Sequence, residues 1–178
     1  MHKPLLLSLA DNIDTGIKRI GNVIAWAYIL LIIAIITQIV LRRGLHSGLI
    51  ALEELQWHLY AVGVMFGMAY TQVLNSHVRV DIVHQNLRPR TQHWIEIFGL
   101  LCLAIPFIST VFINSFDFVY EAWRVNEESS SPSGLPWRWL IKAVIPASCA
   151  MLLLAFVARL ARSIHLLRHP ASDFEGVA

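Results

Sequence analysis

Long apolar blocks separated by short charged segments are the feature that most limits what this chain can fold into. A helix advances about 1.5 Å per residue, so roughly 20 apolar residues cross the roughly 30 Å hydrocarbon core of a bilayer. Four blocks approach this length, and we expect membrane-spanning helices at residues 20–41, 55–74, 97–116 and 137–158. The pattern predicts an all-α integral membrane protein, with residues 1–178 forming a single membrane domain.

The composition supports a membrane protein. Of the 178 residues, 56% are hydrophobic and only 15% are charged, whereas soluble domains carry about 25% charged residues. The net charge is only +2, and no basic run is interleaved with aromatic residues, so we expect no nucleic-acid partner. Cys102 and Cys149 lie inside apolar blocks without metal-binding spacing, and we interpret them as small buried hydrophobes.

The first block, residues 20–41, carries no charge and is followed by Arg42-Arg43. A cleaved signal peptide is the competing interpretation, but its apolar region has only about 7–15 residues before a small-residue cleavage site. We therefore expect a retained helix. Asp11 or Asn12 is a candidate cap for an amphipathic turn that precedes it at the membrane surface.

The distribution of lysine and arginine predicts the orientation. With the N-terminus inside, nine of the 14 basic residues lie on the inner side and five on the outer side, which favours cytoplasmic termini. Residues 77–90 then form an inner connection, and their apolar spacing predicts a short helix along the interface. In the third block, Pro106 should bend the helix because proline donates no backbone hydrogen bond.

The second block carries the most distinctive polar and small residues. Glu53 and Glu54 open it, close to Trp57, and negative charge is favoured at a helix N-terminus. Cation binding or acid–base chemistry is the alternative role, but no second carboxylate pair occurs at membrane depth, so we expect the pair to cap the helix or to dock to a partner protein. Gly63 and Gly67 form a G-x-x-x-G step that lets another helix approach closely. The pattern leaves open whether that helix belongs to this chain or to another subunit.

The blocks contain few groups suited to catalysis, cofactor binding or ion passage. A haem held between helices needs two axial ligands, and of the eight histidines only His58 lies within a block. The main polar residues in or beside the blocks are uncharged, so no ionisable relay is indicated: Asn22, Gln38, Thr71 and Asn114. We expect no enzyme activity, cofactor or metal. The alternatives are a haem- or quinone-binding membrane anchor of a respiratory complex and a stand-alone small exporter.

Four motifs occur in a familiar order. They are Glu53-Glu54, then His77-Val78-Arg79-Val80-Asp81, then Ser133-Gly134-Leu135-Pro136-Trp137, and finally Pro146 within the fourth block. Over about residues 15 to 165, the chain resembles the small membrane subunit (Q-type, or small permease) of tripartite ATP-independent periplasmic (TRAP) transporters.

The resemblance implies a multi-pass protein of the bacterial inner membrane. It would scaffold a large multi-spanning subunit, which holds the sodium and substrate sites, and a periplasmic binding protein would deliver an organic acid. Glu53, Glu54 and the loop up to Pro136 and Trp137 would then face the periplasm. His77, Arg79 and Asp81 would organise the inner turn. Arg42-Arg43 on the outer side departs from the orientation pattern, and nothing in the chain identifies the transported acid.

Overall fold

Within the residues that the structure describes, every regular element is a helix. The structure is a computed structural model, and it describes residues 5–74 and 89–168. Its elements are α1 (Leu5–Gly44), α2 (Ile50–Val73), α4 (Pro89–Phe98), the π-helical segment η1 (Gly99–Ala104), α5 (Ile105–Arg124) and α6 (Arg138–Arg168). The predicted all-α class is confirmed. The predicted interfacial residues His77, Arg79 and Asp81 lie outside the described part of the chain.

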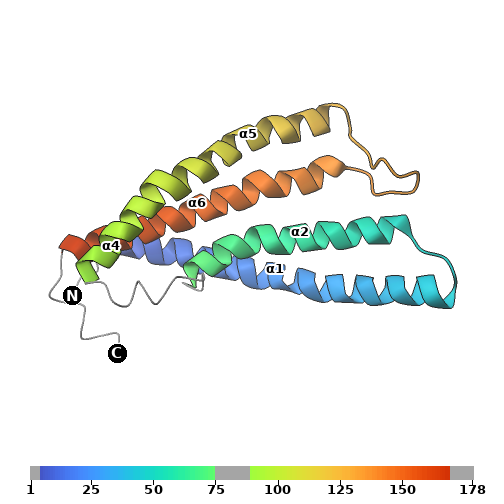
Figure 1. The fold of residues 1–178 in the computed structure, drawn as a ribbon, viewed down its shortest axis with the longest axis horizontal. Coiled ribbons are helices and arrows are strands. Elements are labelled where there is room, and N and C mark those ends of the chain that lie inside the picture. Colours follow the sequence, from blue (N-terminus) through green and yellow to red (C-terminus); the bar gives the residue numbers. More distant parts are fainter. Residues whose placement is uncertain (1–4, 75–88, 169–178) are drawn as a thin grey trace.

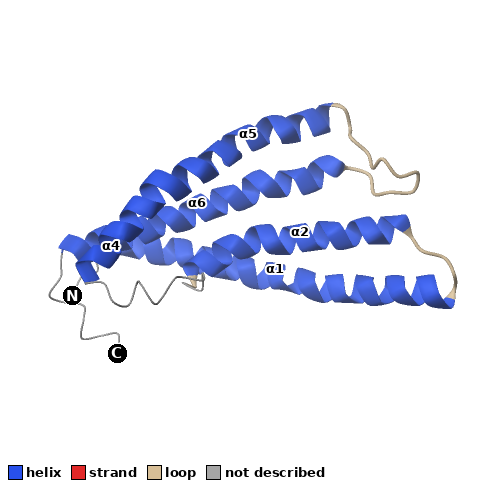
Figure 2. Cartoon of the chain, viewed as in Figure 1, coloured by secondary structure: helices blue, strands red, loops and turns tan. Residues whose placement is uncertain are grey.

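The helices form two long hairpins, α1–α2 and α5–α6 (Figure 1). Short loops, residues 45–49 and 125–137, close the hairpins at one end, which we call the loop end (Figure 2). At the opposite end, the terminal end, α1 begins and α6 finishes, so the two described chain ends lie on the same side of the bundle.

Among the described residues, three helical stretches are long and apolar enough to cross a membrane: Leu7–Gly44, Thr91–Arg124 and Arg138–His165. All three extend past the spans predicted from the sequence, because charged residues at the membrane surface continue the helix rather than end it. The predicted cap at Asp11 or Asn12 is wrong for this reason, since both residues lie inside α1. The amphipathic turn expected there is the first part of the same long helix.

The predicted second span, residues 55–74, is found as a helix but not as a candidate span. α2 has 24 residues and packs between α1 and α6, yet it is not among the three stretches that are apolar enough to span. Polar side chains at both ends lower its hydropathy: Glu53, Glu54, Gln56, His58, Thr71 and Gln72. Within the described part of the chain, three of the four predicted spans are therefore found as candidate spans, and the second is found as a helix.

The bend expected at Pro106 coincides with a change of helix type. The chain is helical from α4 through η1 to α5, and the π-helical segment ends two residues before Pro106. A proline offers no N–H to the carbonyl four residues earlier, and an extra residue in the preceding turn accommodates that loss. The helix changes direction at this point (Figure 1).

α6 lies at the centre of the bundle. It packs against α1, α2, α4 and α5, and small residues along it are almost completely buried, among them Ser148, Ala155 and Ala158. Small side chains let neighbouring helices approach closely in a membrane. The apolar core lies where α6 meets α1, α2 and η1: Ile17, Ala69, Leu100, Met151, Leu152, Ala155 and Phe156.

Candidate functional site

The tandem carboxylates at the start of α2 bind in two different directions. Glu53 points to α1, where its Oε1 accepts hydrogen bonds from Arg42 (2.6 Å) and from the Gln38 amide (3.0 Å). The Gln38 Oε1 in turn accepts a hydrogen bond from the backbone N–H of Leu49. Arg42, which departed from the orientation pattern, therefore has a carboxylate partner beside it. Glu53 joins the end of α1 to the beginning of α2.

Glu54 binds the loop between α5 and α6. Its carboxylate accepts hydrogen bonds from the Ser129 hydroxyl and from the backbone N–H of Leu135, the latter at 2.6 Å. These two hydrogen bonds, from Ser129 and then Leu135, lower the pKa of the Glu54 carboxyl. Gly134 makes the contact possible, since a Cβ there would lie 2.8 Å from Glu54 Oε1 and would collide with Ser129.

The 125–137 loop is also held by ion pairs to the start of α6. Glu127 binds Lys142 and lies 3.7 Å from Arg138, and the Glu127 carbonyl accepts the Arg138 N–H. Trp137 adopts a left-handed backbone with φ of 62°, which is uncommon for a bulky residue. The surrounding contacts therefore impose a sharp turn directly before α6.

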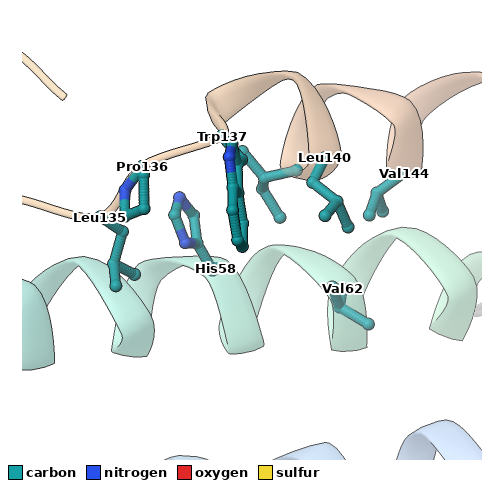
Figure 3. Close-up of a pocket in the computed structure, with 8 residues that line it drawn as sticks. His58, Val62, Leu135, Pro136, Trp137, Leu140 and Val144 are labelled. Carbon is teal, nitrogen blue, oxygen red and sulfur yellow. The ribbon is translucent and has the colours of Figure 1, made fainter. Parts of the chain in front are cut away.

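An apolar cavity of about 390 Å³ lies between α2 and α6 near the loop end. Trp137 and Leu140 line it from the α6 side, and His58 and Val62 line it from α2 (Figure 3). Pro136 lines it too, so two residues of the loop expected to face the periplasm lie at this cavity. Pro146 lines a second apolar cavity of about 410 Å³ between α5 and α6. Trp57 is 71% exposed.

The two glycines of the G-x-x-x-G step behave differently. A Cβ on Gly63 would lie 2.5 Å from the Tyr28 ring of α1, whereas a Cβ on Gly67 would meet nothing within 4 Å. A second close approach of α1 and α2 was not anticipated from the sequence. There, Gly21 lies against the Tyr70 ring, and the Tyr70 hydroxyl donates a hydrogen bond to Asn22.

The terminal end is joined by ion pairs that sequence reasoning missed. Arg162 of α6 binds Asp11 at 3.0 Å and also binds Asp14, and both carboxylates belong to α1. Arg159 of α6 binds Glu96 of α4 at 2.5 Å. The pairs link α1 and α4 through α6. The available signal was weak: two acidic residues three apart at one end of the chain and two arginines three apart at the other.

The predicted site residues thus divide by location. Glu53, Glu54, Pro136 and Trp137 come together at the loop end, while Gly63 lies deeper at the α1–α2 contact. Across residues 5–74 and 89–168, no group of three or more histidine, cysteine or acidic side chains is arranged to hold a metal ion. The predicted site residues that the structure describes mainly make contacts between helices and between helices and loops.

The comparisons with known proteins give one match. A family model described as "Tripartite ATP-independent periplasmic transporters, DctQ component" matches residues 31–166. This range contains both hairpin loops and most of the bundle. No curated protein and no solved structure matches the chain.

Proposed function

The chain belongs to the DctQ-component family of TRAP transporters, and from this premise we propose that it is a non-catalytic scaffold. In this proposal it braces the large membrane subunit of a sodium-driven importer. The imported substrate is an organic acid that a periplasmic binding protein delivers. Sodium and substrate bind the large subunit, and this chain lies in the bacterial inner membrane with both termini in the cytoplasm.

One observation carries the proposal: charged side chains at both ends of the bundle bind helices to one another. Glu53 and Glu54 do so at the loop end. Arg159 and Arg162 do so at the terminal end. Ionisable residues that mark an ion or proton path in a membrane protein line its interior. Here they fix the relative positions of helices, which is the property required of a brace.

We also propose that α2 is a fourth transmembrane helix. Its 24 residues extend about 36 Å, which exceeds the roughly 30 Å hydrocarbon core. It packs along α1 and α6, and those neighbours shield part of its less apolar surface. With four crossings both termini lie on one side, in agreement with the excess of basic residues predicted there.

Uptake by reconstituted vesicles tests the scaffold role. Vesicles would contain the large subunit alone, this chain alone, or both, with a sodium gradient and the substrate-loaded binding protein outside. We expect accumulation of the organic acid only when both subunits are present. Equal uptake by the large subunit alone would contradict the scaffold role, and uptake by this chain alone would favour the stand-alone exporter. Neither the described residues nor the family match supports a haem- or quinone-binding anchor.

A further inference from the structure

One side of α5 carries a row of polar residues that the bundle does not cover. Thr110, Asn114, Asp117 and Glu121 follow one another at intervals of four, three and four residues, which places them on one face of a helix. All four are exposed. We call this row the α5 polar stripe. It is turned about 120° around the helix axis from the side of α5 that carries the buried residues Ser115 and Ala122.

The stripe extends into the membrane. Trp94 and Trp123 are exposed near the two ends of the α4–α5 helix, and they lie about 43 Å apart along it, close to the full thickness of a bilayer. Tryptophan favours the headgroup level. With Trp123 at that level, Asp117 lies about 2 Å and Asn114 about 7 Å inside the hydrocarbon boundary. Thr110 lies deeper still.

Two members of the stripe, Asn114 and Asp117, have side-chain oxygens that accept no hydrogen bond from the described residues. The Thr110 hydroxyl and the Asn114 amide donate to backbone carbonyls one turn earlier, so the Asn114 Oδ1 remains available. Among the described residues, Asp117 has neither a hydrogen bond nor an ion pair. A carboxylate facing hydrocarbon is unfavourable, and charged residues in spanning helices generally face protein or water. The stripe is therefore poorly suited to a lipid contact.

The outer face of α1 provides the contrast. Between residues 20 and 41 its exposed residues are mostly apolar, among them Val23, Leu30, Ile33 and Val40. The exposed Thr37 hydroxyl donates to its own helix. Lipid acyl chains can cover such a face without leaving a polar side chain lacking a hydrogen bond. α1 and α5 thus present two chemically different surfaces to the surroundings of the bundle.

We propose that the α5 polar stripe is the surface that docks a transmembrane helix of the large subunit. The matching helix would present hydrogen-bond donors opposite Asn114 and a lysine or arginine near Asp117. Polar side chains join helices within membranes by hydrogen bonds of this kind. The inference rests on the proposed function, and it adds which surface of this chain meets the partner.

Photo-crosslinking in the intact complex tests the location. A photoreactive amino acid would replace Ile113, which flanks the stripe and is 66% exposed, or Ile33 on α1, which is 55% exposed. We expect the probe at 113 to crosslink the large subunit and the probe at 33 to label lipid. The reverse pattern, or a crosslink from 113 to a second copy of this chain, would overturn the inference. Failure of the unmodified subunits to associate would instead overturn the proposed function.

A substitution gives a second test, in which the stability of the isolated chain and its binding to the large subunit should change in different ways. Asp117→Leu removes the charge and makes the stripe more compatible with lipid. We therefore expect unchanged or higher thermal stability of the isolated chain but about a tenfold loss of large subunit recovered with it. Glu128→Leu, in the exposed loop, is the control and should leave recovery unchanged. Unchanged recovery with Asp117→Leu would show that the stripe does not form the interface.

Discussion

The Glu54 carboxylate accepts the backbone N–H of Leu135 at 2.6 Å, although the two residues lie 81 positions apart in sequence. Its neighbour Glu53 binds Arg42 in the opposite direction. Two adjacent carboxylates therefore join three segments: the end of α1, the start of α2 and the loop between α5 and α6. The α1–α2 and α5–α6 hairpins are linked at the loop end through this pair.

The first prediction concerns the 125–137 loop. Glu54→Ala removes the acceptor of the Leu135 N–H, so hydrogen exchange at that amide should become faster. Glu53→Ala is a matched control one residue away, and it should leave Leu135 exchange unchanged while loosening the 45–49 loop. Exchange at Leu135 that responds equally to both substitutions would argue against the separate roles of the two carboxylates.

The second prediction is a pH dependence at Glu54. Its pKa is lowered in the folded state, so the stabilisation is complete above the unfolded pKa of about 4.3 and is lost as pH falls through the lower folded value. Thermal midpoints of the wild type and Glu54→Gln in detergent should differ most at pH 7 and converge in acid. A difference that stays constant from pH 7 to pH 3 would contradict this.

The third prediction ranks the glycines at the α1–α2 contact. A Cβ on Gly21 would lie 2.8 Å from Tyr70 Cγ and 3.1 Å from its Cβ, which are close to the backbone and cannot move far. Gly21→Ala should therefore lower the free energy of unfolding by about 1–3 kcal/mol. Gly63→Ala should cost less, because the far end of the Tyr28 ring can move aside.

Two glycines serve as controls for this ranking. A Cβ on Gly16 of α1 or on Gly67 of α2 would meet nothing within 4 Å. Alanine at either position should leave the free energy of unfolding unchanged or raise it, since alanine is the better helix former. Equal losses at positions 16 and 21 in mixed-micelle denaturation would mean that the Tyr70 contact is unimportant.

The fourth prediction concerns the terminal end. Asp14 is only 8% exposed, and Arg162 binds it. Arg162→Leu leaves that buried carboxylate without its arginine and should lower the free energy of unfolding by about 3–5 kcal/mol. Asp14→Asn in the same background should recover part of the loss. Arg43→Leu, at an exposed position, should change stability by no more than about 0.5 kcal/mol.

The helical class could be predicted because the length and apolar composition of each block are enough to indicate a helix within a membrane. Residues 20–41 and 137–158 specify long helices whatever surrounds them, and Pro106 marks a local backbone problem that the π-helical segment η1 resolves. The helix ends could not be predicted in the same way. Asp11 has the residue type of a cap, but its carboxylate binds Arg162, 151 residues away.

The contacts between helices depend on rotations and helix order that periodicity does not contain. Glu53 and Glu54 were identified from the sequence, but their opposite directions follow from the position of α2 between α1 and α6. Gly63 and Gly67 are equivalent as a pattern, yet only Gly63 faces the α1 ring of Tyr28. The pairing of Arg159 with Glu96 likewise requires α4 to lie beside the end of α6.

Mild-detergent co-purification with the large membrane subunit tests the scaffold claim most directly. The chain would carry an affinity tag, and the recovered complex would be resolved by size and its subunits quantified. We predict that the large subunit is recovered with this chain in a fixed ratio. Recovery of this chain without any larger multi-spanning partner, in detergent that preserves membrane complexes, would contradict the account.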